Sequence, residues 1–222
     1  MPPEFVEENA LWVDGWIAMP YEVLMRFGRW DEILAEPEPA EYLPLSRAML
    51  HYARGVAYAA QGKVEEARAE QQAFAAESAR VSEEATFGNN PSRALLGVAA
   101  ALLDGEILIR TGAMDEGLAR LREAVVLEDA LRYDEPPDWI QPVRHALGAT
   151  LLAAGRAAEA ETVFRADLDK LPGNGWALFG MGRALRLQGR DAEAERFEEE
   201  FRTAWEGADV EIDSPCFCQR GV

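Results

Sequence analysis

The sequence has few basic residues and few cysteines, and each scarcity excludes a class of protein. There are 22 lysines and arginines against 40 aspartates and glutamates, which leaves a formal net charge of −18. Nucleic acid and anionic membrane surfaces are therefore not expected as partners, because both require a positive surface. The two cysteines, Cys216 and Cys218, are too few for a disulfide framework, and we expect a cytoplasmic location.

Long apolar runs are also missing. The longest run, LLGVAAALL from Leu95 to Leu103, falls far short of the ~20 residues that cross a bilayer. The opening residues MPPEFVEENALW contain no basic segment ahead of an apolar stretch, so no secretory signal is expected. Hydrophobic residues nevertheless make up 49% of the 222 positions, enough to bury one core, and no linker marks a domain boundary.

Residues that favour strands are outnumbered by residues that favour helices. The chain has 38 alanines but only 24 valines, isoleucines and threonines together. Alanine loses no side-chain entropy in a helix, whereas β-branched residues do. We therefore predict an all-α fold.

A repeat of 34 residues runs through the C-terminal part of the sequence. A shift by this length places Gly148 on Gly182, Gly155 on Gly189 and Ala160 on Ala194. Each unit is predicted to form one helix, a turn at Gly-Arg and a second helix. Weaker copies precede it. The predicted units are a partial repeat at 11–35, repeats at about 46–80, 94–128, 139–172 and 175–206, and a tail at 207–222.

These residues resemble the tetratricopeptide repeat, a helical hairpin of about 34 residues. The matching positions are Leu147, Gly148, Leu151, Gly155, Ala160, Phe164 and Pro172. The phrases YDEPPDW and NGWALFGMGRAL are similar to the C-terminal half of a group of uncharacterised bacterial proteins of this type. The resemblance implies an α-solenoid of antiparallel hairpins, four repeats plus a partial one, in a single domain. It implies no chemistry.

A concave groove is expected along the first helix of each repeat. The repeat positions predict that arginines, a histidine and aromatic residues face this groove, and Trp139 is added from the loop beside it. The candidate binding residues are Tyr52, Arg110, Trp139, His145, Trp176, Phe179, Arg183 and Arg186. Arginine forks bind carboxylates, so we expect an extended peptide with an acidic or carboxylate group, anchored by Arg183 and Arg186. The alternative is that both arginines pair with acids such as Glu193 or Glu198.

The loop YDEPPDW, from Tyr133 to Trp139, allows two interpretations. It is either a lid or wall of the groove, with Asp134 and Glu135 as ligand or metal contacts, or a segment that pins a long connection to the array.

The Cys216-Phe217-Cys218 tail also leaves alternatives open. Two thiolates at this spacing suit a soft metal such as Cu(I), or complete a zinc site with imidazoles. The other interpretations are a disulfide and two thiols without metal. No other cofactor is expected.

No catalytic motif stands out. The sequence lacks G-x-S-x-G, a P-loop, H-E-x-x-H and a dinucleotide fingerprint. We therefore predict a non-catalytic protein-interaction or scaffold module. The alternative function is a small-molecule or metal-binding protein that uses the groove, the loop and the cysteine pair. A homo-oligomer formed through the N-terminal hairpin is a further prediction.

Overall fold

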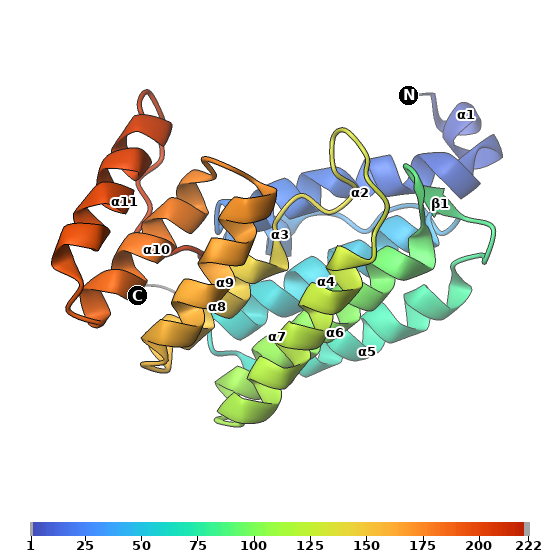
Figure 1. The fold of residues 1–222 in the computed structure, drawn as a ribbon. Coiled ribbons are helices and arrows are strands. Elements are labelled where there is room, and N and C mark those ends of the chain that lie inside the picture. Colours follow the sequence, from blue (N-terminus) through green and yellow to red (C-terminus); the bar gives the residue numbers. More distant parts are fainter. Residues whose placement is uncertain (1, 220–222) are drawn as a thin grey trace. The chain divides into compact units, whose positions relative to one another are not determined.

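The computed structural model describes residues 2–219, and these residues are organised as helical hairpins with almost no sheet (Figure 1). The contacts divide the chain into two compact units, Met1–Gln141 and Pro142–Val222. The predicted all-α repeat architecture is confirmed. The sequence predicted a single domain, whereas the contacts separate two compact units. None of the described helices is long and apolar enough to cross a membrane.

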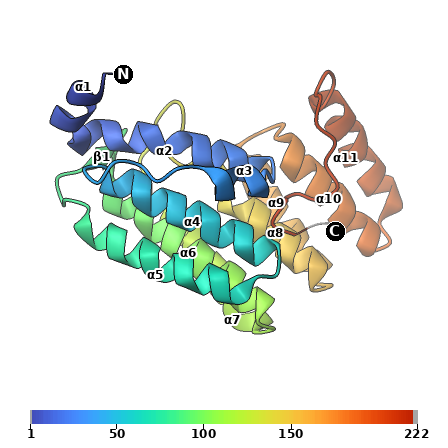
Figure 2. The ribbon, with the colours of Figure 1, turned by 180° about the vertical axis from the view of Figure 1, so that it is seen from behind.

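The first unit contains seven helices and a two-stranded ribbon among its described residues. The helices and strands are α1 (Pro3–Glu8), α2 (Ala10–Arg26), α3 (Trp30–Ala35), α4 (Pro44–Ala60), α5 (Val64–Arg80), β1 (Thr86–Phe87), β2 (Asn90–Pro91), α6 (Ser92–Arg110) and α7 (Met114–Asp129). Helix α4 packs against both α2 and α6, and it therefore lies in the middle of the unit (Figure 2). The ribbon is antiparallel and pairs Phe87 with Asn90.

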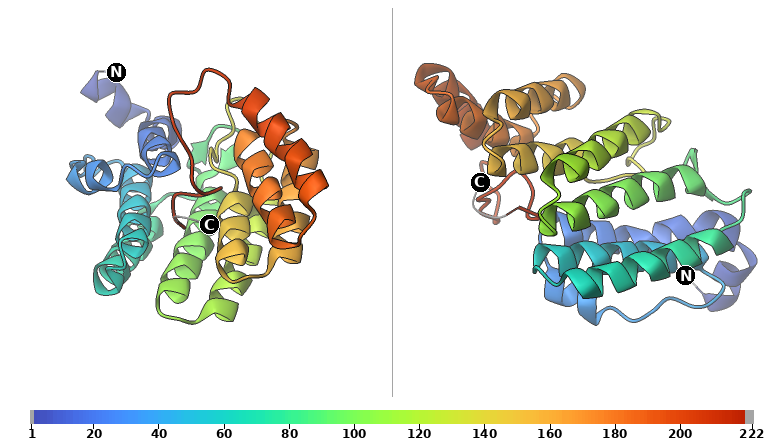
Figure 3. Two further views of the ribbon diagram at one scale, coloured as in Figure 1. Left: turned by 90° about the vertical axis from the view of Figure 1, so that its left-hand side faces the viewer. Right: turned by 90° about the horizontal axis from the view of Figure 1, so that it is seen from below.

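The second unit consists of two hairpins and the C-terminal tail. Its helices are α8 (Val143–Ala153), α9 (Ala157–Lys170), α10 (Gly175–Leu187) and α11 (Asp191–Ala204). Figure 3 shows α10 and α11, in orange and red, running antiparallel as the two arms of one hairpin. The turn glycines Gly155 and Gly189 have φ angles of 72° and 71°, a left-handed conformation that favours glycine.

The hairpins are held together by small residues opposite large ones. The ring of Phe164 on α9 lies against Gly148 of α8 and against Gly180 of α10. Phe164 is completely buried, as are Ala160 and Ala194 of the second helices. Glycine and alanine let the helix axes approach closely, which explains why the repeat retains them.

A buried acid, Asp14, joins helix α2 to helix α4 in the first unit. Asp14 of α2 accepts hydrogen bonds from the backbone N–H groups of Leu45 and Ser46, at 2.8 and 2.9 Å. These two amides belong to the first turn of α4, where helical N–H groups lack partners within the helix. The carboxylate therefore caps α4 from another helix, although burial raises the pKa of Asp14.

Candidate functional site

A hollow of about 310 Å³ lies between α10 and α11. It is lined by Phe179, Arg183, Glu198, Phe201 and Arg202. The rings of Phe179 and Phe201 meet edge to face, with centroids 5.4 Å apart, and form an apolar wall. Two predicted binding residues, Phe179 and Arg183, therefore lie together.

Arg183 is the available cation of this hollow. It is exposed, and among residues 2–219 it has neither a hydrogen bond nor an ion pair. Its neighbour Glu198 is already engaged: hydrogen bonds from Arg186 hold the pKa of Glu198 below its usual value, and the charges of Arg202 and Arg183 act in the same direction. A carboxylate that entered the hollow would meet Arg183, which has no hydrogen bond or ion pair within residues 2–219 and lies in electrostatic range of Glu198.

Arg186, the second predicted anchor, is occupied by acids of its own hairpin. Its Nε and Nη2 atoms donate to the two carboxylate oxygens of Glu198, at 2.9 and 2.8 Å. Its Nη1 atom donates to Asp191 at 3.0 Å. The prediction that Arg186 anchors a ligand is therefore corrected: its fork is already used, as the alternative interpretation of this residue expected.

His145 does not line a groove. It is fully buried on α8, and its Nε2 atom lies 3.0 Å from Oδ2 of Asp167 on α9. Asp167 is only 2% exposed, so the pair joins the two arms of one hairpin away from solvent. The prediction of ligand contact is corrected, because a repeat position says on which side of a helix a residue lies but not what covers it.

Trp176 is likewise buried, inside an aromatic cluster of the second unit. Its ring lies edge to face against Trp205, at 5.6 Å, and against Phe217 of the tail, at 5.4 Å. Only 6% of Trp176 is exposed. Trp176 therefore holds α11 and the tail in place and is not available to a ligand.

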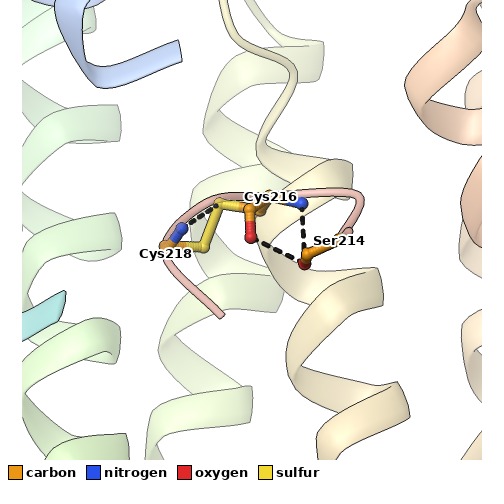
Figure 4. The surroundings of a disulfide bond; sticks show 3 residues. All are labelled: Ser214, Cys216 and Cys218. Atoms are coloured by element: carbon orange, nitrogen blue, oxygen red, sulfur yellow. Dashed lines mark hydrogen bonds between the residues drawn. A yellow bond between two sulfur atoms is a disulfide. The ribbon is translucent and has the colours of Figure 1, made fainter. Parts of the chain in front are cut away.

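The two cysteines of the tail are bonded to each other (Figure 4). Both are buried and pack against Ala146 and Ala149 of α8. The hydroxyl of Ser214 donates to the carbonyl of Cys216 at 2.7 Å and accepts from its amide at 3.2 Å. In this form neither sulfur is a thiolate ligand, and within residues 2–219 no group of three or more candidate ligands could hold a metal. The metal prediction could apply only to the reduced chain.

In the first unit, Tyr52 of α4 is buried beneath the loop that precedes α8. Its ring lies 5.7 Å from that of Trp139 and 6.5 Å from that of Phe74. Tyr52 is 2% exposed and Trp139 is 6% exposed. The prediction that both line an open groove is corrected, because each covers the other.

The loop that carries Trp139 is pinned to the ribbon. Asn90, itself buried, donates to the carbonyl of Arg132 at 3.0 Å and to Asp138 at 2.7 Å. The backbone of Asn89 donates to Asp134 at 2.9 Å. Glu135 is bonded to the hydroxyl of Tyr133. These bonds support the interpretation that the loop secures a long connection, and they engage both acids that were predicted as metal contacts.

Two buried acids of the first unit, Glu22 and Glu106, are not among the candidate binding residues that the sequence predicted. Glu22 of α2 accepts a hydrogen bond from the backbone N–H of Ile140 at 2.8 Å, and burial raises its pKa to about 8. Glu106 of α6 is fully buried, which raises its pKa to about 7, although the charge of Arg110 acts in the opposite direction. Arg110 is half-buried at the end of α6. The sequence signal for both glutamates is an acidic residue on the otherwise apolar, buried face of a helix.

Comparison with known proteins decides the fold type. No protein-family model matches the chain, and no curated protein is significantly similar to it. The Rap conjugation gene regulator of the plasmid pLS20, solved with the Phr* peptide, has 20% identity and a TM-score of 0.57, with 86% of this chain and 50% of that chain covered. A putative kinesin light chain of Podosopora anserina with nearly identical TPR-like repeats has 19% identity and a TM-score of 0.50, with 89% and 99% covered.

The chain has a tetratricopeptide-type repeat fold. A substituted form of the Podosopora anserina protein is 20% identical with a TM-score of 0.51, with 87% of this chain and 96% of that chain covered. Identities of this size establish the fold alone. This tetratricopeptide-type chain spans half the length of the Rap regulator that it matches.

Proposed function

We propose that the chain is a non-catalytic protein-interaction module whose α10–α11 hollow binds an acidic peptide segment. The observation that carries this proposal is Arg183, an exposed guanidinium without an ion-pair partner among residues 2–219, set beside the apolar wall of Phe179 and Phe201. A guanidinium binds a carboxylate through two parallel hydrogen bonds, and the phenyl rings suit an adjacent apolar side chain.

The repeat fold supports this use of the surface. Helical repeats present rigid faces that do not reorder on binding, which reduces the entropy lost by the complex. The Rap regulator of similar fold was solved in complex with a peptide. As part of the proposal, we infer that this chain also binds a peptide.

The test is selection from a displayed library of random peptides, followed by affinity measurement of the selected peptides by fluorescence polarisation. We expect selected peptides to carry an aspartate, a glutamate or a free C-terminal carboxylate next to an apolar residue. Arg183→Ala should weaken their binding by about tenfold or more, because it removes a hydrogen-bonded charge pair.

Arg196→Ala is the matched control. Arg196 lies exposed on α11, is not among the residues that line the hollow, and carries the same charge. Its replacement should leave peptide affinity unchanged. Peptides without acid enrichment, or equal affinity in Arg183→Ala and the native chain, would remove Arg183 as the anchor and with it the proposed site.

A further inference from the structure

The tail of the second unit forms a turn that is closed by the disulfide between Cys216 and Cys218 (Figure 4). Phe217 stands between the two bonded cysteines. The hydroxyl of Ser214 bonds to the carbonyl and the amide of Cys216, and the amide of Gln219 donates to the same carbonyl at 3.0 Å. The amide of Cys218 lies 3.2 Å from Sγ of Cys216. The shape of this turn therefore depends on the bond between the sulfurs.

The turn packs against the first helix of each hairpin in its unit. The two cysteines lie against Ala146 and Ala149 of α8. The ring of Phe217 meets that of Trp176 on α10 edge to face, with centroids 5.4 Å apart. A covalent cross-link reduces the conformations open to the residues it encloses. The disulfide therefore restricts where the ring of Phe217 can point.

A series of ring contacts leads from this turn to the hollow between α10 and α11. Trp176 meets Trp205 at 5.6 Å, and Trp205 stacks on Phe201 at 5.4 Å. Phe201 meets Phe179 at 5.4 Å. Phe179 and Phe201 line the hollow. The disulfide turn and the apolar wall of the hollow are thus joined by contacts within one unit.

Trp205 is tightly held in the middle of this series. Its Nε1 atom donates to the carbonyl of Val210 at 2.6 Å. A Cβ atom added to Gly175 would lie 2.5 Å from Cε3 of its ring, so α10 leaves the ring no free space on that side. Closely packed groups pass a displacement on to their neighbours, because they cannot be compressed. A change in the position of Phe217 therefore has a physical route to the hollow.

We propose that Cys216 and Cys218 form a redox modification site that regulates the hollow between α10 and α11. In the oxidised chain the closed turn holds Phe217 against Trp176 and so supports the aromatic wall. A dithiol reductant breaks the bond between the sulfurs and two S–H bonds form, while the two thiols of the reductant join in a disulfide of their own. The opened turn releases Phe217, and the hollow loses affinity for its ligand. The inference rests on the proposed function for what the hollow binds.

The reductant reaches the sulfurs through local opening of the turn. Cys216 and Cys218 are 3% and 4% exposed, so a thiolate attacks only when the turn has lifted from α8. Short segments open locally without unfolding of the helices beneath them. Exchange in the opened turn therefore leaves both hairpins intact.

The first experiment compares the oxidised full chain with the same chain reduced by dithiothreitol. Alkylation with iodoacetamide followed by mass spectrometry verifies the state of the two cysteines. The probe is an acidic, cysteine-free peptide selected as described for the proposed function, and its affinity is measured by fluorescence polarisation. Reduction should weaken binding by about fivefold or more, the usual size of coupling between two sites.

Variants separate the disulfide from the ring contacts. The double variant Cys216→Ser, Cys218→Ser should bind like the reduced chain, with and without dithiothreitol, which also controls for effects of the reductant. Phe217→Ala keeps both cysteines and removes the ring, so its affinity should not respond to reduction. Phe27→Ala is the matched control: it removes a 42% exposed ring from the first unit and should retain the full response.

Fluorine NMR of the full chain labelled with 5-fluorotryptophan gives a readout that needs no peptide. Resonances are assigned by replacing single tryptophans with phenylalanine. The Trp205 resonance should shift on reduction, because its ring lies between the turn and the hollow. The Trp16 resonance should not shift, because Trp16 packs against Phe87 in the other unit.

Four results would overturn the redox link. They are two alkylated thiols after treatment with an oxidant, an unchanged Trp205 resonance, equal peptide affinity in both redox states, and a full response in Phe217→Ala. The proposed function fails differently, through the absence of selected acidic peptides or through undiminished binding in Arg183→Ala. In that event the Trp205 resonance still decides whether the cysteine pair acts on the wall of the hollow.

Discussion

Phe164 lies so close to Gly148 that a Cβ atom added to the glycine would be 2.3 Å from Cζ of the ring. The ring cannot move away from α8, because a Cβ atom at Gly180 on α10 would lie 2.4 Å from the same Cζ atom. One phenyl ring thus fills the space between two glycines of adjacent hairpins, and it sets how closely the helices approach.

Gly148→Ala should therefore destabilise the chain. Overpacking a closed core costs about 1–3 kcal/mol, and we expect the upper part of this range because neither neighbouring helix leaves room. The measurement is the free energy of unfolding from urea denaturation. Gly97→Ala is the control: it is also helical, but its added Cβ would meet only Leu127 at 3.9 Å. It should be neutral or stabilising by up to about 1 kcal/mol. A Gly148→Ala variant as stable as the native chain would contradict this packing.

Glu106 should make the chain less stable as pH rises. Its pKa is about 7 in the folded chain and near 4.5 when exposed. Below 4.5 the group is protonated in both states and has no effect. As pH rises from 4.5 to 7, the unfolded chain ionises first, so unfolding becomes more favourable, and the loss is complete above 7. Its size is on the order of 3 kcal/mol.

The check is urea denaturation of native chain and Glu106→Gln at several pH values, in phosphate and not in an amine buffer. The variant should lose less stability between pH 4.5 and 7 than the native chain, because glutamine does not ionise. Exposed Glu65→Gln should follow the native curve. Parallel curves for the native chain and Glu106→Gln would show that Glu106 does not titrate in this range.

The N-terminal hairpin carries an apolar surface that suits the predicted self-association. Trp12 and Val23 of α2 are 50% and 43% exposed. A hollow of about 540 Å³ lies on the same helix, lined by Trp16, Met19, Pro20, Val23, Leu24 and Glu36. Exposed apolar patches of this kind mark interaction surfaces.

We predict that Val23→Glu shifts the chain from an oligomer to a monomer in size-exclusion chromatography with light scattering. The added charge would have to be desolvated in a contact through α2, which is costly. Val126→Glu introduces the same charge on α7, where the valine is 68% exposed, and should not change the mass. A native chain that is already monomeric at micromolar concentration would refute self-association through this face.

The sequence by itself determined the helices and how they pair. The composition favours helices, and Gly148, Gly155 and Ala160 each have a counterpart 34 residues later. Both signals reflect local geometry, because they mark where the chain must turn and where two neighbouring helices need a small residue. These requirements are written along the chain, and the hairpins follow from them. The clustering of Phe179 with Arg183 also follows, because both lie on one face of one helix.

Only the tertiary structure decided which side chains remain available. Repeat position predicted that His145, Trp176 and Arg186 would face the groove, as Arg183 does. The first two are buried, and Arg186 is hydrogen-bonded to Glu198. Their partners come from other segments, Asp167, the tail and α11, and no spacing along the chain specifies those encounters. Glu22 and Ile140, 118 residues apart, meet for the same reason. Burial and charge pairing arise from contacts between segments, so they appear only once the chain has folded.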